Sequence, residues 1–251
     1  MSGQHPVGDS AAGAIRQHLE QVELARELGF SSVWASQHFL SEPFLYFQTV
    51  PLLSRVAAVA DGMTVGTAVV LLTLLNPVEV AENAATLDAI AEGRFVLGMG
   101  LGYRAVENAA FAVAKRRGEL FERKLEVVRR LLAGESVTAS GQGFELAEAR
   151  LTLLPERVPP IWVAADSDAG AQRAARLADA WLVSPHTRLD ELDRQMRLYR
   201  LERAQHGLPA VPPPSAPRHR LDPLPKVEPV TTTPPPAQTP QRPRAESHST
   251  R

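Results

Sequence analysis

The sequence has no cysteine among its 251 residues. Disulfides, thiolate nucleophiles and zinc–sulfur sites are therefore excluded, and the absence suits a reducing compartment such as the cytoplasm. An excess of one charge is also missing, because 27 lysines and arginines nearly balance 28 aspartates and glutamates. A formal net charge of −1 carries no global sign of nucleic-acid binding. We expect no nucleic-acid partner and no metal site.

Long apolar runs are absent too. None reaches the roughly 18 residues that a membrane-spanning helix needs. The N-terminal stretch MSGQHPVGDSAAGAI lacks the basic segment and apolar core of a signal peptide. Hydrophobic residues still make up 44% of the chain, enough to bury a sizeable core. We therefore expect a cytoplasmic protein without a membrane segment.

The clearest secondary-structure pattern in the sequence lies in residues 63–111, which predict a strand, a helix and a second strand. Residues 63–72 form an apolar, β-branched run typical of a buried strand. Asn76 and Pro77 suit a helix start, because asparagine caps well and proline fits the first helical position. Gly93 ends this helix, and residues 94–97 form the next strand. The order predicts a right-handed parallel βαβ unit.

Glycines at alternate positions, Gly98, Gly100 and Gly102, follow the second strand. Without side chains they let the backbone approach a flat or anionic molecule. Parallel sheets bind their ligands at the carboxyl ends of the strands. We therefore expect a binding site where this glycine run and the end of the first strand, near Thr67 and Ala68, lie together.

The remaining chain up to residue 208 continues the alternation of helices and strands. Expected helices are 11–28, 49–61, 77–91, one or two within 111–132 (the second at 118–133), 171–178 and 189–206; expected strands are 32–35, 161–165 and 179–184. Residues 1–10 are typical of a loop, and residues 136–154 of a hairpin between barrel units. We expect residues 1–208 to form a single α/β domain.

The composition changes abruptly after residue 208. Residues 209–251 are rich in proline, serine, threonine and arginine, have no aromatic residue and show no helix or strand period. We expect a disordered tail, with proline runs at 212–214 and 234–236 leaving a proline-binding partner as an alternative. The change also resembles a reading-frame shift or an early end of the coding sequence, which sequencing the locus tests.

A family resemblance covers residues 14–207. The stretch VGTAVVLLTLLNPVEVAENAATLDAIAEGRFVLGMGLGY resembles the signature region of the bacterial-luciferase-like flavin-dependent oxidoreductases, which include flavin monooxygenases and reductases that use the deazaflavin F420. The likeness rests on order: a G-T-A strand, N-P opening a helix, then T-L-D, G-R-F and alternating glycines. It implies a (β/α)8 TIM barrel, here incomplete, since the first strand and the last two βα units have no counterpart in the sequence.

The resemblance also implies a site. It places Thr67, Ala68, Gly100, Gly102 and Tyr103 along a flavin ring, with a cis peptide between Ala68 and Val69, and Ser167 and the Gly170 N–H at its phosphate. His38 matches the histidine of the family's W-x-x-E-H pattern and is the expected catalytic residue, acting by hydrogen bond or proton transfer. The family's acidic residue is replaced by Gln37. A structural role for His38 and simple N-capping by Ser167 remain alternatives.

Other features stay open at this point. Two roles are open for Arg104: it binds an anion beside the glycine turn, or it is simply solvated by water. Two roles are also open for Glu107: it pairs with Arg104, or it lies in the first turn of the next helix, where a negative charge is favoured. A cluster of aromatic residues either lines a pocket or packs beneath a loop. It comprises Phe39, Phe44, Tyr46 and Phe47.

The resemblance implies a flavin-dependent oxidoreductase, first of all a monooxygenase that uses reduced FMN and oxygen on a small organic substrate. A flavin reductase would then supply the reduced flavin. Hydride transfer with F420 is the alternative within the same fold. A catalytically inactive, truncated barrel that needs a partner for stability is the alternative from another class. A homodimer is compatible with each of them.

Overall fold

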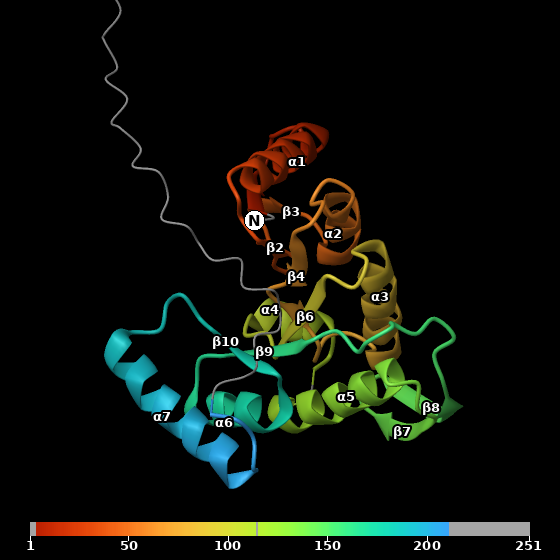
Figure 1. Ribbon diagram of the computed structural model, residues 1–251, viewed down its shortest axis with the longest axis vertical. Helices are drawn as coiled ribbons and strands as arrows, with labels where there is room; N and C mark the ends of the chain where they lie inside the picture. The colour runs from red at the N-terminus through yellow and green to blue at the C-terminus, as the bar shows by residue number, and fades with distance from the viewer. Residues whose placement is uncertain (1–3, 114, 211–251) are drawn as a thin grey trace, which may run out of the picture. The chain divides into compact units, whose positions relative to one another are not determined.

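The computed structural model describes residues 4–113 and 115–210 (Figure 1). The helices are α1 Ala11–Glu27, α2 Thr49–Ala57, α3 Pro77–Ile90, α4 Ala105–Ala110, α5 Arg117–Leu132, α6 Asp168–Leu177 and α7 Leu189–Gln205. The strands are β1 Gln4–Pro6, β2 Ser32–Ala35, β3 Phe44–Tyr46, β4 Thr64–Thr67, β5 Val70–Leu71, β6 Phe95–Gly100, β7 Val137–Gly141, β8 Phe144–Ala149, β9 Ile161–Ala165 and β10 Ala180–Val183. The expected tail lies outside the described residues from position 211 onward.

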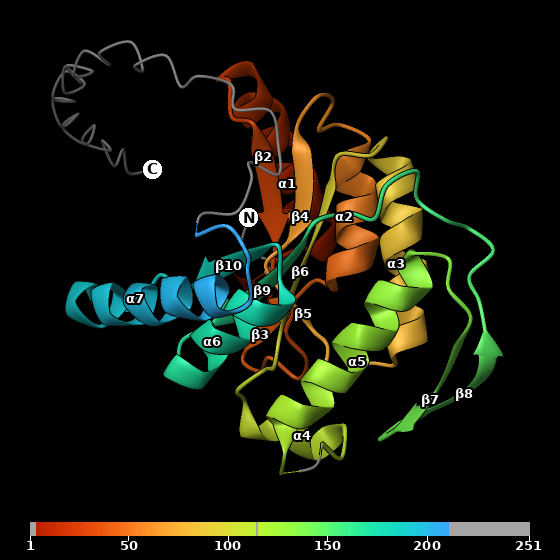
Figure 2. The same ribbon diagram turned by 60° about the horizontal axis from the view of Figure 1, so that its bottom comes forward.

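A six-stranded sheet organises the part of the chain that the structure describes. Its order is β10-β9-β6-β4-β2, all parallel, with β5 pairing to β6 off this path. Along this path the strands follow one another in the order in which they occur in the chain, as in a barrel, and β2 and β10 form the edges. Helices α2, α3 and α6 pack on these strands, and α5 lies against α3 (Figure 2). The predicted incomplete (β/α)8 barrel is confirmed, and β7 and β8 form the predicted hairpin.

Two tryptophan rings fill the space inside the curved sheet. Trp34 of β2 and Trp162 of β9 stack with ring centroids 4.9 Å apart, although β4 and β6 lie between their strands. Gly66 of β4 makes room for them, since a Cβ there would lie 2.3 Å from the Trp34 ring. Contact between such distant strands requires strong curvature of the sheet. The rings therefore form a packed interior like that of a barrel.

The run predicted as one strand over residues 63–72 is divided. Strand β4 pairs with β6 through Val65 and Gly66, and β5 pairs with β6 further along. Between them the Ala68–Val69 peptide bond is cis, which confirms the prediction from the resemblance. The Thr67 hydroxyl replaces the missing strand pairing: it accepts the Gly98 N–H at 2.8 Å and donates to the Gly98 carbonyl at 2.7 Å.

Replacing Thr67 by valine tests this hydroxyl bridge. Thr67 is fully buried, so Thr67→Val keeps the shape but leaves two buried backbone groups of Gly98 without their partner. We expect a loss of about 1–3 kcal/mol in the free energy of unfolding, measured with urea. Thr86→Val is the control, because Thr86 is exposed and bonds only to its own helix at Glu82. An equal loss in both variants would contradict the bridge.

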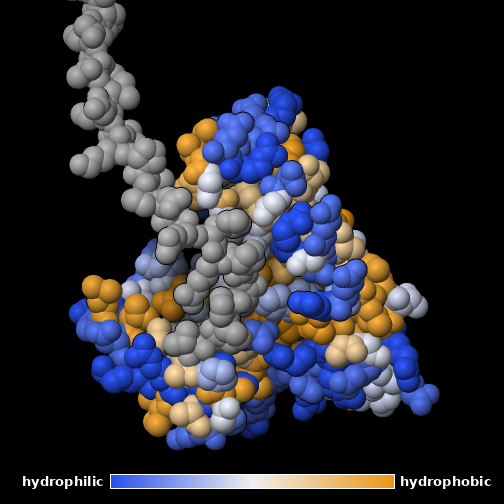
Figure 3. Space-filling view, viewed as in Figure 1, coloured by the Kyte–Doolittle hydropathy of each residue, from blue (hydrophilic) through white to orange (hydrophobic). Residues whose placement is uncertain are grey.

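Helix α1 buries Ala14, His18 and Val22, which are spaced by four residues. Ile15, Leu19 and Ala25 pack against the core beside them and are partly buried. Its N-terminus is capped by Ser10, whose hydroxyl accepts the Gly13 N–H at 3.1 Å. The face of α1 seen in Figure 3 is mainly hydrophilic. This helix, predicted over residues 11–28, is thus amphipathic. Within the described ranges, no helix combines the length and apolarity needed to cross a membrane.

The prediction that residues 1–10 form only a loop is wrong. Residues Gln4–Pro6 form β1, which pairs antiparallel with β3, so that His5 lies opposite Leu45. The Nε2 atoms of His5 and His18 lie 2.8 Å apart, and Phe47 packs against both rings. Because this pairing joins segments that are distant in sequence, the local composition gives no sign of it.

The contact between His5 and His18 predicts that the folded protein becomes less stable in acid. Burial, and secondarily His5, lower the pKa of His18 below its ordinary value of 6.5. The folded protein therefore binds the His18 proton less tightly than the unfolded chain does, so stability is complete above about pH 6.5 and falls as pH drops through the lowered pKa. We expect the urea midpoint to fall between pH 7.5 and pH 5, and His18→Gln to flatten this slope. The exposed His206→Gln variant should keep it.

Lysine 124 anchors α5 beneath the loop that leads into α3. Its buried Nζ donates to the carbonyl oxygens of Thr73 at 3.0 Å and Leu75 at 2.6 Å, and burial lowers its pKa. At the end of this loop Asn76 caps α3, as predicted, by accepting the Val78 N–H at 2.9 Å. The loop after β5 is thereby fixed at the carboxyl end of the sheet.

Candidate active site

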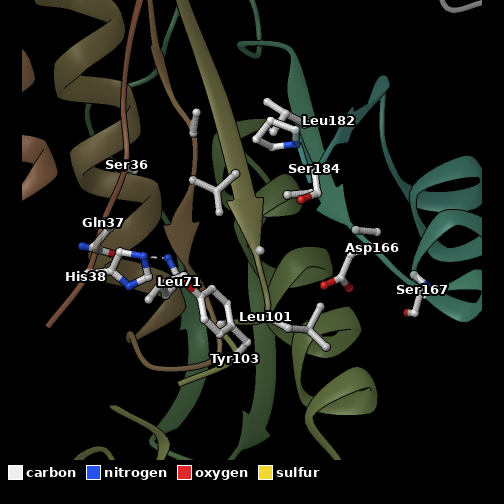
Figure 4. A pocket seen from close by; sticks show the side chains of 18 of the residues that line it. Ser36, Gln37, His38, Leu71, Leu101, Tyr103, Asp166, Ser167, Leu182 and Ser184 are labelled. Carbon is white, nitrogen blue, oxygen red and sulfur yellow. Dashed lines mark hydrogen bonds between the residues drawn. The ribbon is translucent and has the colours of Figure 1, made fainter. Parts of the chain in front are cut away.

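A cavity of about 290 Å³ opens at the carboxyl ends of β2, β6, β9 and β10 (Figure 4). Of the residues predicted for a site, those lining it are His38, Ala68, Gly100, Gly102, Tyr103, Ser167 and Gly170. Further lining residues are Ser36, Gln37, Val69, Leu71, Leu101, Ala164, Ala165, Asp166, Arg173, Leu182, Ser184 and Pro185. Thr67 instead lies behind this wall, because its hydroxyl is taken up by Gly98. Segments far apart in sequence thus meet at one end of the sheet.

The glycine run shapes one side of the cavity. A Cβ on Gly100 would lie 2.8 Å from Cγ2 of Val69, so the strand and the β4–β5 turn approach each other closely here. Gly102 has φ of +72°, a left-handed conformation that L side chains rarely adopt. Gly100 and Gly102 put no side chain of their own into the cavity beside Tyr103, and Val69 and Leu71 pack against them. A wall with few protruding side chains suits a flat ring better than a branched molecule.

His38 is held by a buried carboxylate from α4, the helix that follows β6. Its Nδ1 lies 2.9 Å from Oε1 of Glu107, whose side chain is only 1% exposed. The same oxygen accepts the Phe39 N–H at 2.9 Å. When Nδ1–H donates to this carboxylate, Nε2 is the ring nitrogen that stays available for proton exchange. Sequence reasoning missed this pair, because the two residues lie on different βα units.

The guanidinium of Arg104 forms hydrogen bonds with neighbouring groups of the protein itself. Its Nη1 donates to the Phe39 carbonyl at 2.8 Å and lies 3.3 Å from Glu107, and its Nη2 donates to the Leu40 carbonyl at 3.1 Å. Glu107 lies in the first turn of α4, so both interpretations of this glutamate hold together. Arg104 and Glu107 therefore lock the loop after β2 onto α4.

The aromatic cluster packs around this loop. Phe39 contacts Phe111 at a centroid distance of 4.7 Å, and Tyr46 meets His38 edge-on at 5.3 Å. The Tyr46 hydroxyl bonds to Ser36, while burial raises the Tyr46 pKa, so this hydroxyl stays protonated at neutral pH. Packing beneath a loop is the interpretation that these contacts favour.

Gln37 stands where the resembling family has an acidic residue, and it is buried. Its Oε1 accepts the Leu71 N–H at 2.9 Å, which ties β5 to the end of β2. This acceptor role needs no charge. The carboxylate beside His38 is supplied instead by Glu107.

The opposite end of the cavity is the turn from β9 into α6. Ser167 caps α6, and its Oγ accepts the Gly170 N–H at 3.2 Å. Asp168 points toward α7 and pairs with Arg194, which lowers the Asp168 pKa. Asp166 lines the cavity, and its carbonyl accepts Nε2 of the buried Gln195 at 3.0 Å. The two acidic neighbours of Ser167 are thus separated.

Arg173 lines the same end, and the sequence analysis did not select it. Its spacing was the available signal, since it follows Gly170 by three residues and so shares its helix face. Across residues 4–113 and 115–210, no group of three or more histidine, aspartate or glutamate side chains is arranged to hold a metal ion.

Comparisons with known proteins agree with this architecture. The family model described as luciferase-like monooxygenase matches residues 1–219. The 4-hydroxyprotoasukamycin monooxygenase of Streptomyces nodosus subsp. asukaensis is 30% identical over 224 residues, which cover 82% of this chain and 58% of that protein. The F420-dependent glucose-6-phosphate dehydrogenase of Kineococcus radiotolerans is 33% identical over 175 residues, covering 66% of this chain and 51% of that protein.

A solved structure is similar as well. The monooxygenase RslO1 from Streptomyces bottropensis superimposes with a TM-score of 0.73 at 29% identity, covering 82% of this chain and 64% of that one. The chain spans about half the length of the curated relatives it matches. From the family match, the strand order and the position of the cavity, we conclude that this chain belongs to the luciferase-like monooxygenase family.

Proposed function

We propose that the chain is a flavin-dependent monooxygenase that binds reduced FMN in the cavity and acts with oxygen on a small organic substrate. The observation that supports this most is the composition of the cavity from end to end. A histidine held by a carboxylate lies at one end, a glycine backbone surface lies in the middle, and an arginine beside a helix N-terminus lies at the other. These parts suit, in order, proton transfer, a flat ring and a phosphate.

The residues present fit such a cofactor. Gly100 and Gly102 leave backbone against a ring, while Ala164, Ala165 and Leu182 provide apolar contacts on the other strands. Asp166 can accept a hydrogen bond from a sugar-like hydroxyl, and Ser167 and Arg173 lie where the phosphate would be held. Bound reduced FMN supplies electrons and activates oxygen. The protein orients the reactants and keeps water from the ring.

His38 has the proton-handling role in this proposal. Glu107 fixes the ring through Nδ1, so Nε2 can donate a hydrogen bond to the bound molecules or take a proton from them. Tyr103, which is 75% exposed and meets His38 edge-on at 5.8 Å, covers this end from the solvent side. A reductase that delivers reduced flavin would be the partner of such an enzyme.

The second candidate is hydride transfer with F420 in the same cavity. The 33% identity to a relative named as an F420-dependent dehydrogenase favours it. The glycine surface, His38 and the phosphate end would serve the deazaflavin in the same way, and no flavin reductase would be needed. The affinity of the chain for reduced FMN and for F420 therefore distinguishes the two candidate functions.

Equilibrium titration of the full chain with reduced FMN and with F420, followed by fluorescence and thermal unfolding, tests the proposal. Tighter binding of reduced FMN supports the monooxygenase, and tighter binding of F420 supports hydride transfer. Ser184→Trp places a large side chain in the cavity and should abolish binding, whereas Ser140→Trp on the exposed hairpin should not. A cooperatively folded wild type that binds neither cofactor would refute both candidates. A chain without a cooperative transition would favour the inactive barrel.

A further inference from the structure

Gln37 is a buried side chain whose orientation is fixed by one hydrogen bond. It lines the cavity at the end of β2, beside His38, and is only 6% exposed (Figure 4). Its Oε1 accepts the Leu71 N–H at 2.9 Å, and because only the oxygen of an amide can accept, Nε2 is the other arm. Within residues 4–113 and 115–210, Nε2 has no hydrogen-bond partner, yet it keeps accessible surface. Its two N–H donors are therefore available to a molecule in the cavity.

Ser36, the preceding residue, contributes a further donor. It lines the cavity, and its hydroxyl is hydrogen-bonded to the hydroxyl of Tyr46. A phenol is a stronger acid than an alcohol, so Tyr46 is the donor in this pair, and burial raises its pKa, so it keeps its proton at neutral pH. The hydroxyl proton of Ser36 is then left for another acceptor. The Ser36 carbonyl accepts the Thr49 hydroxyl at 2.6 Å, which holds this part of the backbone in place.

Carboxylate and guanidinium groups are absent from this end of the cavity, among the residues that the structure describes. Asp166 and Arg173 line the opposite end, at the turn from β9 into α6, and Figure 4 shows Asp166 across the cavity from Gln37. The Glu107 side chain is only 1% exposed and lies outside the lining set. His38 is the third polar group here, and its Nε2 can accept or donate. An ammonium group would therefore find no carboxylate at this end, whereas a carbonyl oxygen would find donors.

A carboxylate at position 37 would have the opposite character. The family pattern W-x-x-E-H has an acidic residue where this chain has Gln37. A carboxylate offers acceptors only, whereas an amide offers one acceptor oxygen and two donors. Gln37 therefore keeps a bond to Leu71 that a carboxylate could also make, and presents donors where a carboxylate would present an acceptor. The departure from the pattern changes which ligand atoms this wall can bind.

We propose that Gln37 and Ser36 together bind a neutral carbonyl oxygen of the substrate, which makes the substrate of this cavity a carbonyl compound rather than an amine. The inference rests on the proposed function, because it concerns the His38 end of the same cavity. Two neutral donors match the two lone pairs of one carbonyl oxygen. An uncharged oxygen suits this wall, since no cation lies at this end to balance an anion.

Two small probes on one carbon skeleton test this on the full chain. Acetophenone only accepts hydrogen bonds, and α-methylbenzylammonium only donates them. Ligand-observed NMR measures both affinities, with and without saturating reduced FMN or F420. We expect the wild type to bind acetophenone at least about tenfold more tightly than the ammonium.

Two variants should shift this preference in different ways. Gln37→Glu keeps an acceptor for the Leu71 N–H but replaces the donors by a carboxylate. At about pH 8, where the introduced carboxyl is ionised, it should bind the ammonium more tightly than acetophenone. Ser36→Ala leaves the contact between Gln37 and Leu71 intact, so it decides the matter if Gln37→Glu folds poorly. It should weaken acetophenone binding about fivefold and leave the ammonium unchanged.

Gln17→Glu is the matched control. Gln17 is exposed on α1, so this variant adds the same charge outside the cavity and should leave both probe affinities unchanged. A reversal of the preference in Gln17→Glu would mean a general charge effect and would overturn the inference.

The remaining outcomes separate this inference from the proposed function. Equal affinities for the two probes, or binding of neither, would overturn the inference, while cofactor binding would leave the proposed function standing. A loss in Gln37→Glu and Ser36→Ala that is confined to cofactor affinity would make both residues cofactor ligands and would also overturn it. The expected preference in a chain that binds neither reduced FMN nor F420 would support the carbonyl site and refute the proposed function.

Discussion

Gly98→Ala is expected to destabilise the protein severely. A Cβ at this position would lie 1.9 Å from the Thr67 carbonyl oxygen, a backbone atom that cannot move without separating β4 from β6. All residues of β6 are buried and the strand lies inside the sheet, so no solvent-facing adjustment is available. We expect a loss of more than about 4 kcal/mol, which is a large part of the stability of an ordinary domain.

Urea unfolding followed by circular dichroism measures this effect against two other glycines. Gly143 has φ of +79° and open space around it, so Gly143→Ala should cost only about 1–2 kcal/mol for the left-handed conformation. Gly100→Ala meets the end of a side chain, Cγ2 of Val69 at 2.8 Å, and should fall between the two. A Gly98→Ala protein as stable as Gly143→Ala would show that β4 and β6 are not packed as described.

Glu107→Gln is expected to weaken the hold on His38 and on the loop after β2. The carboxylate is buried and receives His38 Nδ1, the Phe39 N–H and Arg104 Nη1. The amide keeps one acceptor oxygen but removes the charge that faces Arg104. We expect a loss of about 2–3 kcal/mol, below the range for fully buried pairs because Arg104 is 26% exposed.

Nitrogen-15 spectra of the His38 ring separate positioning from stability. In the wild type the neutral ring should carry its proton on Nδ1, whereas in Glu107→Gln, whose amide oxygen is a weaker acceptor than a carboxylate, the population of the other tautomer should rise. Glu119→Gln is the matched control, since Arg116 and Glu119 have the same spacing and the same 3.3 Å distance but are exposed. It should change stability by no more than about 0.5 kcal/mol and leave the His38 spectrum unchanged. An unchanged tautomer in Glu107→Gln would contradict the assigned role.

Local chemistry made much of the fold predictable from sequence. Asn76 and Pro77 mark the start of α3 because a cap and a fixed φ act within a few residues. The apolar run at 161–165 matches β9 in full, since buried parallel strands are continuously apolar. The strand order follows from the handedness of βα units.

Contacts across the fold were not predictable in the same way. In β4, Thr67 and its neighbours are buried on both faces, so no alternation in the sequence says which side chains meet the cavity. His38 and Glu107 are brought together by the curvature of the sheet, and Arg173 is seated by a glycine on another helix. For cofactor binding itself, the predicted residues remain a proposal.

Hydrogen exchange of the full chain, with and without saturating reduced FMN or F420, tests the central claim most directly. The account predicts that one of the two cofactors slows exchange at residues 100–103 and 165–170, where the backbone lines the cavity, and leaves the β7–β8 hairpin unchanged. Protection confined to other segments, or no protection by either cofactor in a folded chain, would contradict a flavin-type site at the carboxyl ends of these strands.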